Sequence, residues 1–107
     1  MNWIQICTFD DLVAHAGIAA RVTDSQVAIF FEPESNQLYA LSNWDPIAKA
    51  NVMSRGLIAE VDGRLTVASP LYKQRYCLVT GECLDDAVSL PVWNVKLDNN
   101  SVWIAPK

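Results

Sequence analysis

Hydrophobic residues in this chain fall mostly into short runs that are separated by polar turn residues. The runs are rich in β-branched and aromatic residues, and towards the end of the chain they alternate with polar residues, as in strands with one buried face. The predicted strands are Trp3–Cys7, Ala20–Val22, Val27–Phe31, Leu38–Leu41, Leu57–Val61, Arg64–Ala68, Arg75–Val79, Val92–Leu97 and Ser101–Ile104. Many short strands with turns between them predict an all-β fold, either a sandwich or a partly open barrel.

One short N-terminal helix interrupts this pattern. Thr8 is a suitable N-cap, Asp10 and Asp11 place negative charge in the first turn, and Gly17 is expected to end the helix. His15, the only histidine, falls inside this predicted helix. We expect it to be a surface or packing residue, because a metal site normally needs several converging ligands.

Two further segments differ in how clearly they can be interpreted. The dipeptide Asp62-Gly63 tolerates positive φ and predicts a tight hairpin between the strands on either side of it. Asn43 to Arg55 is the least regular section, because Pro46 opposes strand pairing and Ile47–Ala50 is long enough for one helical turn only. Cys83–Ser89 reads as a polar connection.

Composition and charge narrow the class of protein. The 107 residues are 51% hydrophobic and 19% charged, which fits a single domain over residues 1–107 with one core. A net charge of -4 with scattered cations argues against nucleic-acid binding and against an anionic membrane surface. No apolar run approaches the roughly 20 residues of a membrane span, and the start Met1–Gln5 lacks the features of a signal peptide. We therefore expect a cytoplasmic protein.

Three cysteines, Cys7, Cys77 and Cys83, are an odd number without a Cys-x-x-Cys pair. This spacing argues against a disulfide framework and against a zinc site. We expect buried, reduced thiols.

Two short loops, Asn43–Pro46 and Ser69–Lys73, each follow a predicted strand, and neighbouring hairpin ends would bring them to one tip. This layout resembles a Rieske domain, in which a Cys-x-His loop and a Cys-x-x-His loop hold a two-iron cluster through two thiolates and two imidazoles. At the four ligand positions this sequence has Asn43, Asp45, Ser69 and Tyr72. The two loops of the site are kept, but none of the four ligand positions holds a cysteine or a histidine.

Over nearly its whole length the chain resembles a more specific family, the small subunit of assimilatory NAD(P)H-dependent nitrite reductase, a Rieske-like protein without a cluster. The resemblance is carried by motifs in the Rieske order, namely Asn43-x-Asp45-Pro46, Ser54–Ile58, Ser69–Lys73, Tyr76–Gly81 and Leu90–Trp93. It implies a Rieske-like sandwich or partly open barrel.

The resemblance also implies a function. The chain would be a non-catalytic partner of a large subunit that carries flavin (FAD), a [4Fe-4S] cluster and sirohaem, and that reduces nitrite to ammonium with NAD(P)H in nitrate assimilation. We expect this chain itself to bind no cofactor and to contain no catalytic residue.

The residue types also give no indication of a catalytic or cofactor-binding site in this chain. Amide, carboxylate, hydroxyl and phenol groups suit an iron–sulfur cluster poorly, and a single carboxylate is too little charge for a hard cation. Ser69 has no histidine to activate it, and the glycines form no phosphate-binding loop. We interpret the pair Asp85-Asp86 as a solvated face.

The loop residues have a structural interpretation and a functional one. Asn43 and Asp45 would form Asx turns before Pro46, and Tyr72 would hydrogen-bond across the loops. Trp44, Tyr72 and Lys73 are candidates for binding a partner, because aromatic residues anchor interfaces.

Two other functions stay open at this point. One is a ferredoxin-like electron carrier that holds its cluster through unconventional ligands. The other is a free-standing β-sandwich interaction module.

Overall fold

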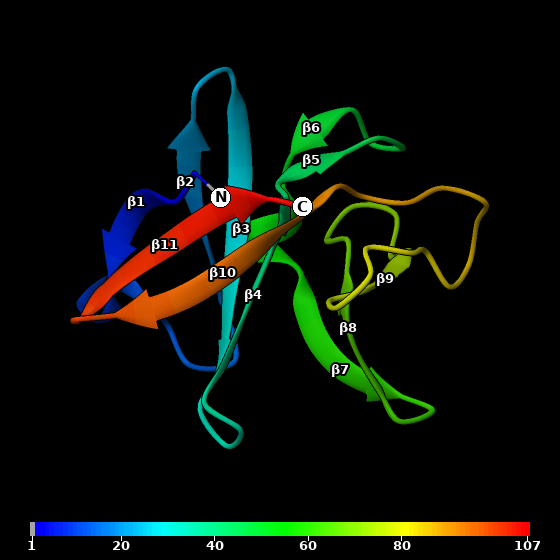
Figure 1. Ribbon diagram of the computed structural model, residues 1–107. Helices are drawn as coiled ribbons and strands as arrows, with labels where there is room; N and C mark the ends of the chain where they lie inside the picture. The colour runs from blue at the N-terminus through cyan, green and yellow to red at the C-terminus, as the bar shows by residue number, and fades with distance from the viewer. Residues whose placement is uncertain (1) are drawn as a thin grey trace.

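Residues 2–107, which the computed structural model describes, fold into short strands joined by turns (Figure 1). Met1, the first residue of the start Met1–Gln5 in which no signal peptide is expected, lies outside the described residues. The elements in chain order are β1 (Ile4–Thr8), η1 (Phe9–Asp11), β2 (Gly17–Val22), β3 (Ser25–Glu32), β4 (Gln37–Ser42), β5 (Trp44–Asp45), β6 (Ala50–Asn51), η2 (Met53–Arg55), β7 (Leu57–Val61), β8 (Arg64–Ala68), β9 (Arg75–Cys77), β10 (Val92–Asp98) and β11 (Ser101–Pro106). Every strand predicted from the sequence is present within a few residues, so the all-β fold is confirmed.

The larger sheet has the strand order β1-β11-β10-β4-β3-β2. Because successive side chains of a strand point to opposite faces, the sheet contributes to two cores. Phe30 and Leu41 belong to the first core, which lies between this sheet and the smaller one. Ile29 and Ala40, one residue away along their strands, belong to a second core with residues of β11. The strands β3 and β4 are therefore buried on both faces.

The smaller sheet has the order β7-β8-β9 and lies to the right of the larger one in Figure 1. Its first hairpin turns at Asp62 and Gly63, whose φ angles of 51° and 79° are those of a type I′ turn. This confirms the predicted hairpin. The central strand carries Val67, which pairs with both Ile58 and Tyr76 and is fully buried.

The predicted N-terminal helix is only a single 3₁₀ turn, η1. Thr8 does begin it, and its backbone N–H donates to the Asp11 carboxylate at 2.9 Å. Leu12 is already extended, and Gly17 begins β2 instead of ending a helix. At Gly17 a Cβ would lie 2.6 Å from the Phe30 ring, so the glycine serves close packing.

His15, which was expected inside the helix, lies in the link to β2 with a φ of 60°. Its Nε2 atom is 2.6 Å from the Glu34 carboxylate in the β3–β4 turn, and the side chain is largely exposed. The expected surface position is confirmed, but the helical setting was wrong.

Three further predictions concern the loop after Pro46, the cysteines and Asp85. Ile47 to Lys49 lies in the turn of the small β5–β6 hairpin and Ala50 begins β6, so the segment is not a helical turn. All three cysteines are free; Cys77 and Cys83 are buried, whereas Cys7 is only partly so. Asp85 and Asp86 are exposed, as expected, and Asp85 also forms an ion pair with Arg75 at 2.6 Å. The Arg75 guanidinium and backbone N–H lower the pKa of Asp85 to about 2.

Among residues 2–107 there is no helix with the length and hydrophobicity that a membrane span requires.

Replacing Val67 by proline should destabilise the domain by on the order of 3 kcal/mol or more, or prevent folding, because proline removes a ladder hydrogen bond from a central strand. A thermal melt followed by circular dichroism measures the effect. Leu57→Pro is the control, since Leu57 is exposed and begins an edge strand. An unchanged melting temperature for Val67→Pro would contradict the described pairing of β8.

Candidate functional site

Asn43 anchors the first loop, which follows β4. Its side-chain Oδ1 accepts a hydrogen bond from the Ser54 backbone N–H at 2.7 Å, and its Nδ2 donates to the Gln26 side-chain oxygen at 2.9 Å. Its backbone oxygen accepts the N–H groups of Val52 and Met53. The side chain therefore joins the loop to β3 and η2, and the Asx turn expected at Asn43 was wrong.

Asp45 connects the first loop to the second. Its Oδ1 atom accepts the backbone N–H groups of Ile47 at 2.9 Å and Ala48 at 3.1 Å, which is the Asx turn predicted around Pro46. Its Oδ2 atom accepts the hydroxyl of Ser69 at 2.5 Å. Both side chains have no exposed surface, so this is a buried, charge-assisted hydrogen bond between the loops.

The second loop is closed mainly by its own backbone. Ser69 donates its N–H to Gln74 at 2.8 Å and accepts the N–H of Lys73 at 3.1 Å, while the Ser69 hydroxyl also accepts the N–H of Leu71 at 3.3 Å. Lys73 has a φ of 68°, a left-handed conformation that turns the chain back towards β9. The loop is thus a compact turn built around Ser69.

Tyr72 lies outside this network. Its side chain is 62% exposed and makes no hydrogen bond with another described residue, so the predicted bond across the loops was wrong. The closed backbone turn projects it outward together with Leu71. Of the four positions that correspond to cluster ligands, Asn43, Asp45 and Ser69 are buried together and Tyr72 is not.

The outward side chains of the two loops form what we call the tip patch, consisting of Trp44, Leu71, Tyr72 and Lys73. Trp44 is 46% exposed, which excludes a place in the core. Lys73 donates from Nζ to the Pro70 backbone oxygen at 3.3 Å. Because the buried Asp45–Ser69 hydrogen bond fixes both loops, these side chains project from a rigid support.

Tyr76 lies beneath the loops, where its side chain is fully buried. The phenol oxygen has no hydrogen-bond partner among the described residues. Burial, followed by the negative charge of Asp45, raises the pKa of Tyr76 to about 12. The phenol is therefore neutral at physiological pH, and it adds bulk to the core below the tip.

The residues present do not fit an iron–sulfur cluster. Such clusters need thiolate and imidazole ligands, whereas the tip offers an amide, a carboxylate and a hydroxyl that already bond to one another or to nearby groups. His15 is bound to Glu34 in another turn. Over residues 2–107 there is no group of three or more His, Cys, Asp or Glu side chains that could hold a metal ion.

Sequence reasoning missed Gln26 and Leu71. Gln26 holds Asn43 through its side chain and through its backbone oxygen, but it is 17 positions away and gives no local signal. Leu71 is an exposed apolar residue within a turn, and its place in the Ser69–Lys73 motif could have indicated it.

Comparison with known proteins places this geometry in a family. A family model described as a Rieske-like [2Fe-2S] domain matches residues 2–105. The nitrite reductase (NADH) small subunit of Escherichia coli K12 is 50% identical over 85 residues, which are 79% of either chain. The chain is a Rieske-like domain of the nitrite reductase small-subunit family. The resemblance noted in the sequence is thereby confirmed.

Two further relatives of this small subunit extend the comparison. The NMR structure of the Escherichia coli protein NirD superimposes with a TM-score of 0.87 at 42% identity, covering 96% of this chain and 94% of that one. A Klebsiella oxytoca protein named nitrite reductase [NAD(P)H] large subunit is 42% identical over 103 residues. These residues are 95% of this chain but only 11% of that protein, so the same domain also occurs within a much longer polypeptide.

The purified small subunit should be colourless and free of iron, because its tip lacks thiolate and imidazole ligands. An absorption spectrum with iron and acid-labile sulfide analysis tests this. Broad visible bands together with stoichiometric iron and sulfide would contradict it.

Replacing Ser69 by alanine should lower the free energy of unfolding by about 1–3 kcal/mol, because it leaves a buried Asp45 oxygen without its donor. Urea denaturation gives the value. Ser35→Ala is a matched control, since the Ser35 hydroxyl bonds to Glu32 at the exposed β3–β4 turn and its loss should stay within about 0.5 kcal/mol. Equal stabilities of the two variants would mean that the bond between the loops is not important for folding.

Proposed function

We propose that this chain is the non-catalytic small subunit of an NAD(P)H-dependent nitrite reductase, and that it acts by binding the large subunit through the tip patch. The observation that carries the proposal is the buried Asp45–Ser69 hydrogen bond, which holds the two loops together where a Rieske domain would hold its cluster. The tip therefore keeps a defined surface without a redox group of its own.

The small subunits of enteric bacteria support this assignment through their names and their identity to this chain. The Klebsiella oxytoca relative supports the choice of partner, because there a region similar to this chain is part of a protein named as the large subunit. When a domain is part of a long polypeptide in one organism and a separate chain in another, we expect the separate chain to bind the corresponding long polypeptide.

The chemistry of the tip patch suits a protein partner. Trp44 and Tyr72 offer large, partly apolar side chains of the type that dominates binding energy at interfaces, and Lys73 adds a cation at their edge. Two loops fixed by buried hydrogen bonds lose little conformational entropy on binding.

In this proposal the large subunit supplies all of the redox chemistry. It would carry flavin, a [4Fe-4S] cluster and sirohaem and reduce nitrite to ammonium in nitrate assimilation, with the small subunit contributing contacts only. We place the complex in the cytoplasm, where the three unpaired cysteines would stay reduced.

The two alternative functions have less support. A ferredoxin-like electron carrier would need cluster ligands, and the tip positions hold oxygen and amide groups that are already hydrogen-bonded. A free-standing interaction module has no observation in its favour beyond the fold.

Truncating Trp44 and Tyr72 together to alanine should weaken association with the large subunit by on the order of 1–4 kcal/mol, the range of buried aromatic anchors. Calorimetric titration of the large subunit with each variant measures this. In the same reconstituted system, nitrite-dependent NAD(P)H oxidation should fall when the variant replaces the wild type at equal, subsaturating concentration.

The double variant Ile4→Ala and Val13→Ala is the matched control, because both residues are exposed and apolar but lie away from the tip. Thermal melts of both double variants establish that each is folded. A folded Trp44/Tyr72 variant with wild-type affinity would remove the tip patch from the interface. Failure of the wild-type chain to bind the large subunit at all would refute the proposed function.

A further inference from the structure

The strands β4 and β10 are neighbours in the larger sheet, but they pair over a short distance only. The paired residues are Val92 with Leu41 and Trp93 with Ala40. By contrast, β4 pairs with β3 along its whole length, and β10 pairs with β11 from Trp93 to Asp98. Beyond the two shared pairs, β4 and β10 diverge towards the β3–β4 turn, at the bottom of Figure 1.

Antiparallel pairing fixes which backbone groups of β4 face this gap. Neighbouring residues of a strand direct their N–H and C=O groups to opposite sides. The Ser42 N–H donates to the Pro91 oxygen on the β10 side, whereas the Asn43 N–H donates to β3. Leu38, four residues before Ser42, therefore presents its N–H and C=O to the gap.

The same reasoning applies to β10. Asp98 and Ser101 close the β10–β11 hairpin, so even-numbered residues of β10 bond to β11. Val95 then directs its N–H and C=O towards β4. In the part of the chain that the structure describes, no strand pairing joins Leu38 to Val95, so each strand has an open edge there.

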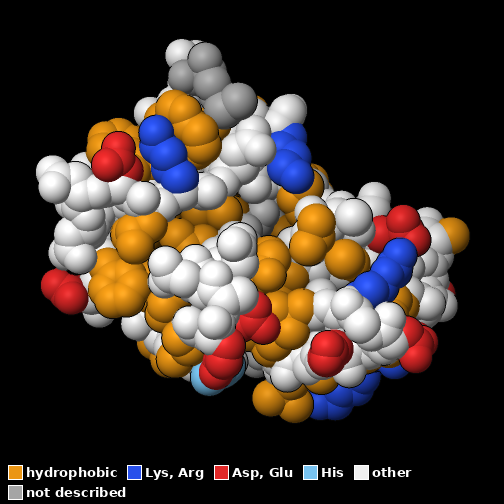
Figure 2. Space-filling view, turned by 60° about the horizontal axis from the view of Figure 1, so that its bottom comes forward, with side chains coloured by type: hydrophobic (Ala, Val, Ile, Leu, Met, Phe, Trp, Pro, Cys, Tyr) orange, Lys and Arg blue, Asp and Glu red, His pale blue; other side chains and the backbone are white. Residues whose placement is uncertain are grey.

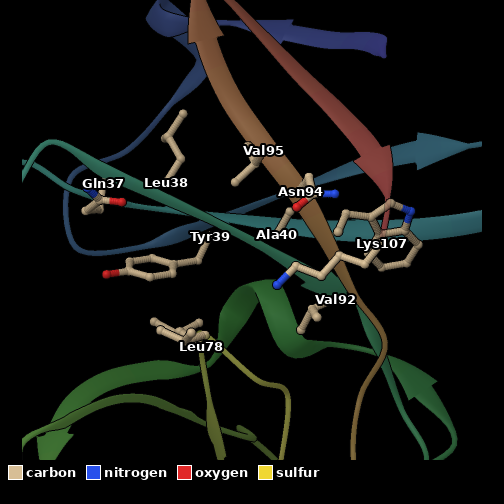
Figure 3. A pocket seen from close by; sticks show the side chains of 11 residues that line it. Gln37, Leu38, Tyr39, Ala40, Leu78, Val92, Asn94, Val95 and Lys107 are labelled. Carbon is tan, nitrogen blue, oxygen red and sulfur yellow. The ribbon is translucent and has the colours of Figure 1, made fainter. Parts of the chain in front are cut away.

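The gap leads into a hollow of about 280 Å³ with apolar walls on both faces of the sheet (Figure 3). Leu38 and Val95 lie on the side of the second core. Tyr39, Leu78 and Val92 lie on the side of the first core. All of these except Leu78 are only partly buried.

The rim of the hollow is of mixed character. Val79 lines it with 55% of its surface exposed, and the Lys107 amine extends across it in Figure 3. Figure 2, in which the bottom of Figure 1 is turned forward, shows hydrophobic side chains exposed on this side of the molecule with acidic and basic side chains among them. The rim therefore combines an exposed apolar side chain with a cation.

These features specify the chemistry of an occupant. Open strand edges bind the backbone of another extended segment, and pockets for alternate side chains determine which segment fits. Because apolar walls lie on both faces of the sheet, the segment would carry apolar side chains at consecutive positions. The hollow is also smaller than the roughly 300–1,000 Å³ of typical small-molecule sites, which favours a few peptide residues over a cofactor.

We infer that the gap between β4 and β10 binds an extended, apolar segment of the large nitrite reductase subunit, which adds a strand to the larger sheet. The inference rests on the proposed function for the identity of the partner, and it adds a second contact surface that is separate from the tip patch. The Klebsiella oxytoca relative, in which this domain is part of the long polypeptide, supports a segment of that polypeptide as the occupant.

Amide hydrogen exchange of the small subunit, alone and in complex with the wild-type large subunit, tests the added strand. The Leu38 and Val95 amides should exchange quickly in the free protein and at least about tenfold more slowly in the complex. The Lys96 amide, on the β11 side of β10, should be slow in both states. Unchanged exchange at Leu38 and Val95 in a complex that has formed would overturn the inference.

A pair of variants gives an independent readout. Val79→Glu places a charge at the apolar rim and should raise the Kd for the large subunit by about tenfold or more. Val13→Glu is the matched control, because Val13 is 52% exposed but precedes the edge strand β2, which β3 separates from β4, and it should leave the Kd unchanged. Melts of both variants confirm folding.

The outcomes separate this inference from the proposed function. If the wild type binds and a folded Val79→Glu variant binds equally well, the added strand is refuted while the small-subunit function stands. If the wild type does not bind, the proposed function fails. If the Leu38 and Val95 amides are already protected in the free protein and become exposed on dilution, a second copy fills the gap, which also overturns the inference.

Discussion

The Asp45 carboxylate is fully buried where the two loops of the tip meet, and burying a charge is costly unless it is hydrogen-bonded. Two backbone N–H groups of its own turn and the Ser69 hydroxyl of the other loop meet this requirement. The shape of each loop is therefore a condition for the stability of the other. Trp44 and Tyr72 project from a fixed support only because this requirement is met.

This arrangement changes what folding of the domain depends on. When a metal centre joins two loops, its binding free energy is part of the folding free energy, so an apo chain is incompletely folded. A carboxylate–hydroxyl hydrogen bond forms from the chain alone. The two loops of this tip are therefore held together without a metal centre.

Alternating hydrophobic and polar residues were sufficient to predict the strands, and Asp62-Gly63 was sufficient for one hairpin, because both are local signals. The N-terminal helix was predicted wrongly because the Thr8 cap was real, but β2 begins at Gly17 and pairs with β3 instead. At the tip, the sequence indicated the loops and the Asx turn of Asp45. It could not indicate that Gln26 holds Asn43 or that Tyr72 points outward, since both depend on how distant segments pack.

The first and last strands of the domain, β1 and β11, are hydrogen-bonded neighbours, and Ile4 pairs with Ile104. A chain that enters and leaves at adjacent points can be inserted into or joined to another polypeptide without spreading its ends apart. Neither strand contributes to the tip. With this arrangement of its terminal strands, the domain can be encoded either as a separate chain or as part of a longer polypeptide, as in the Klebsiella oxytoca relative.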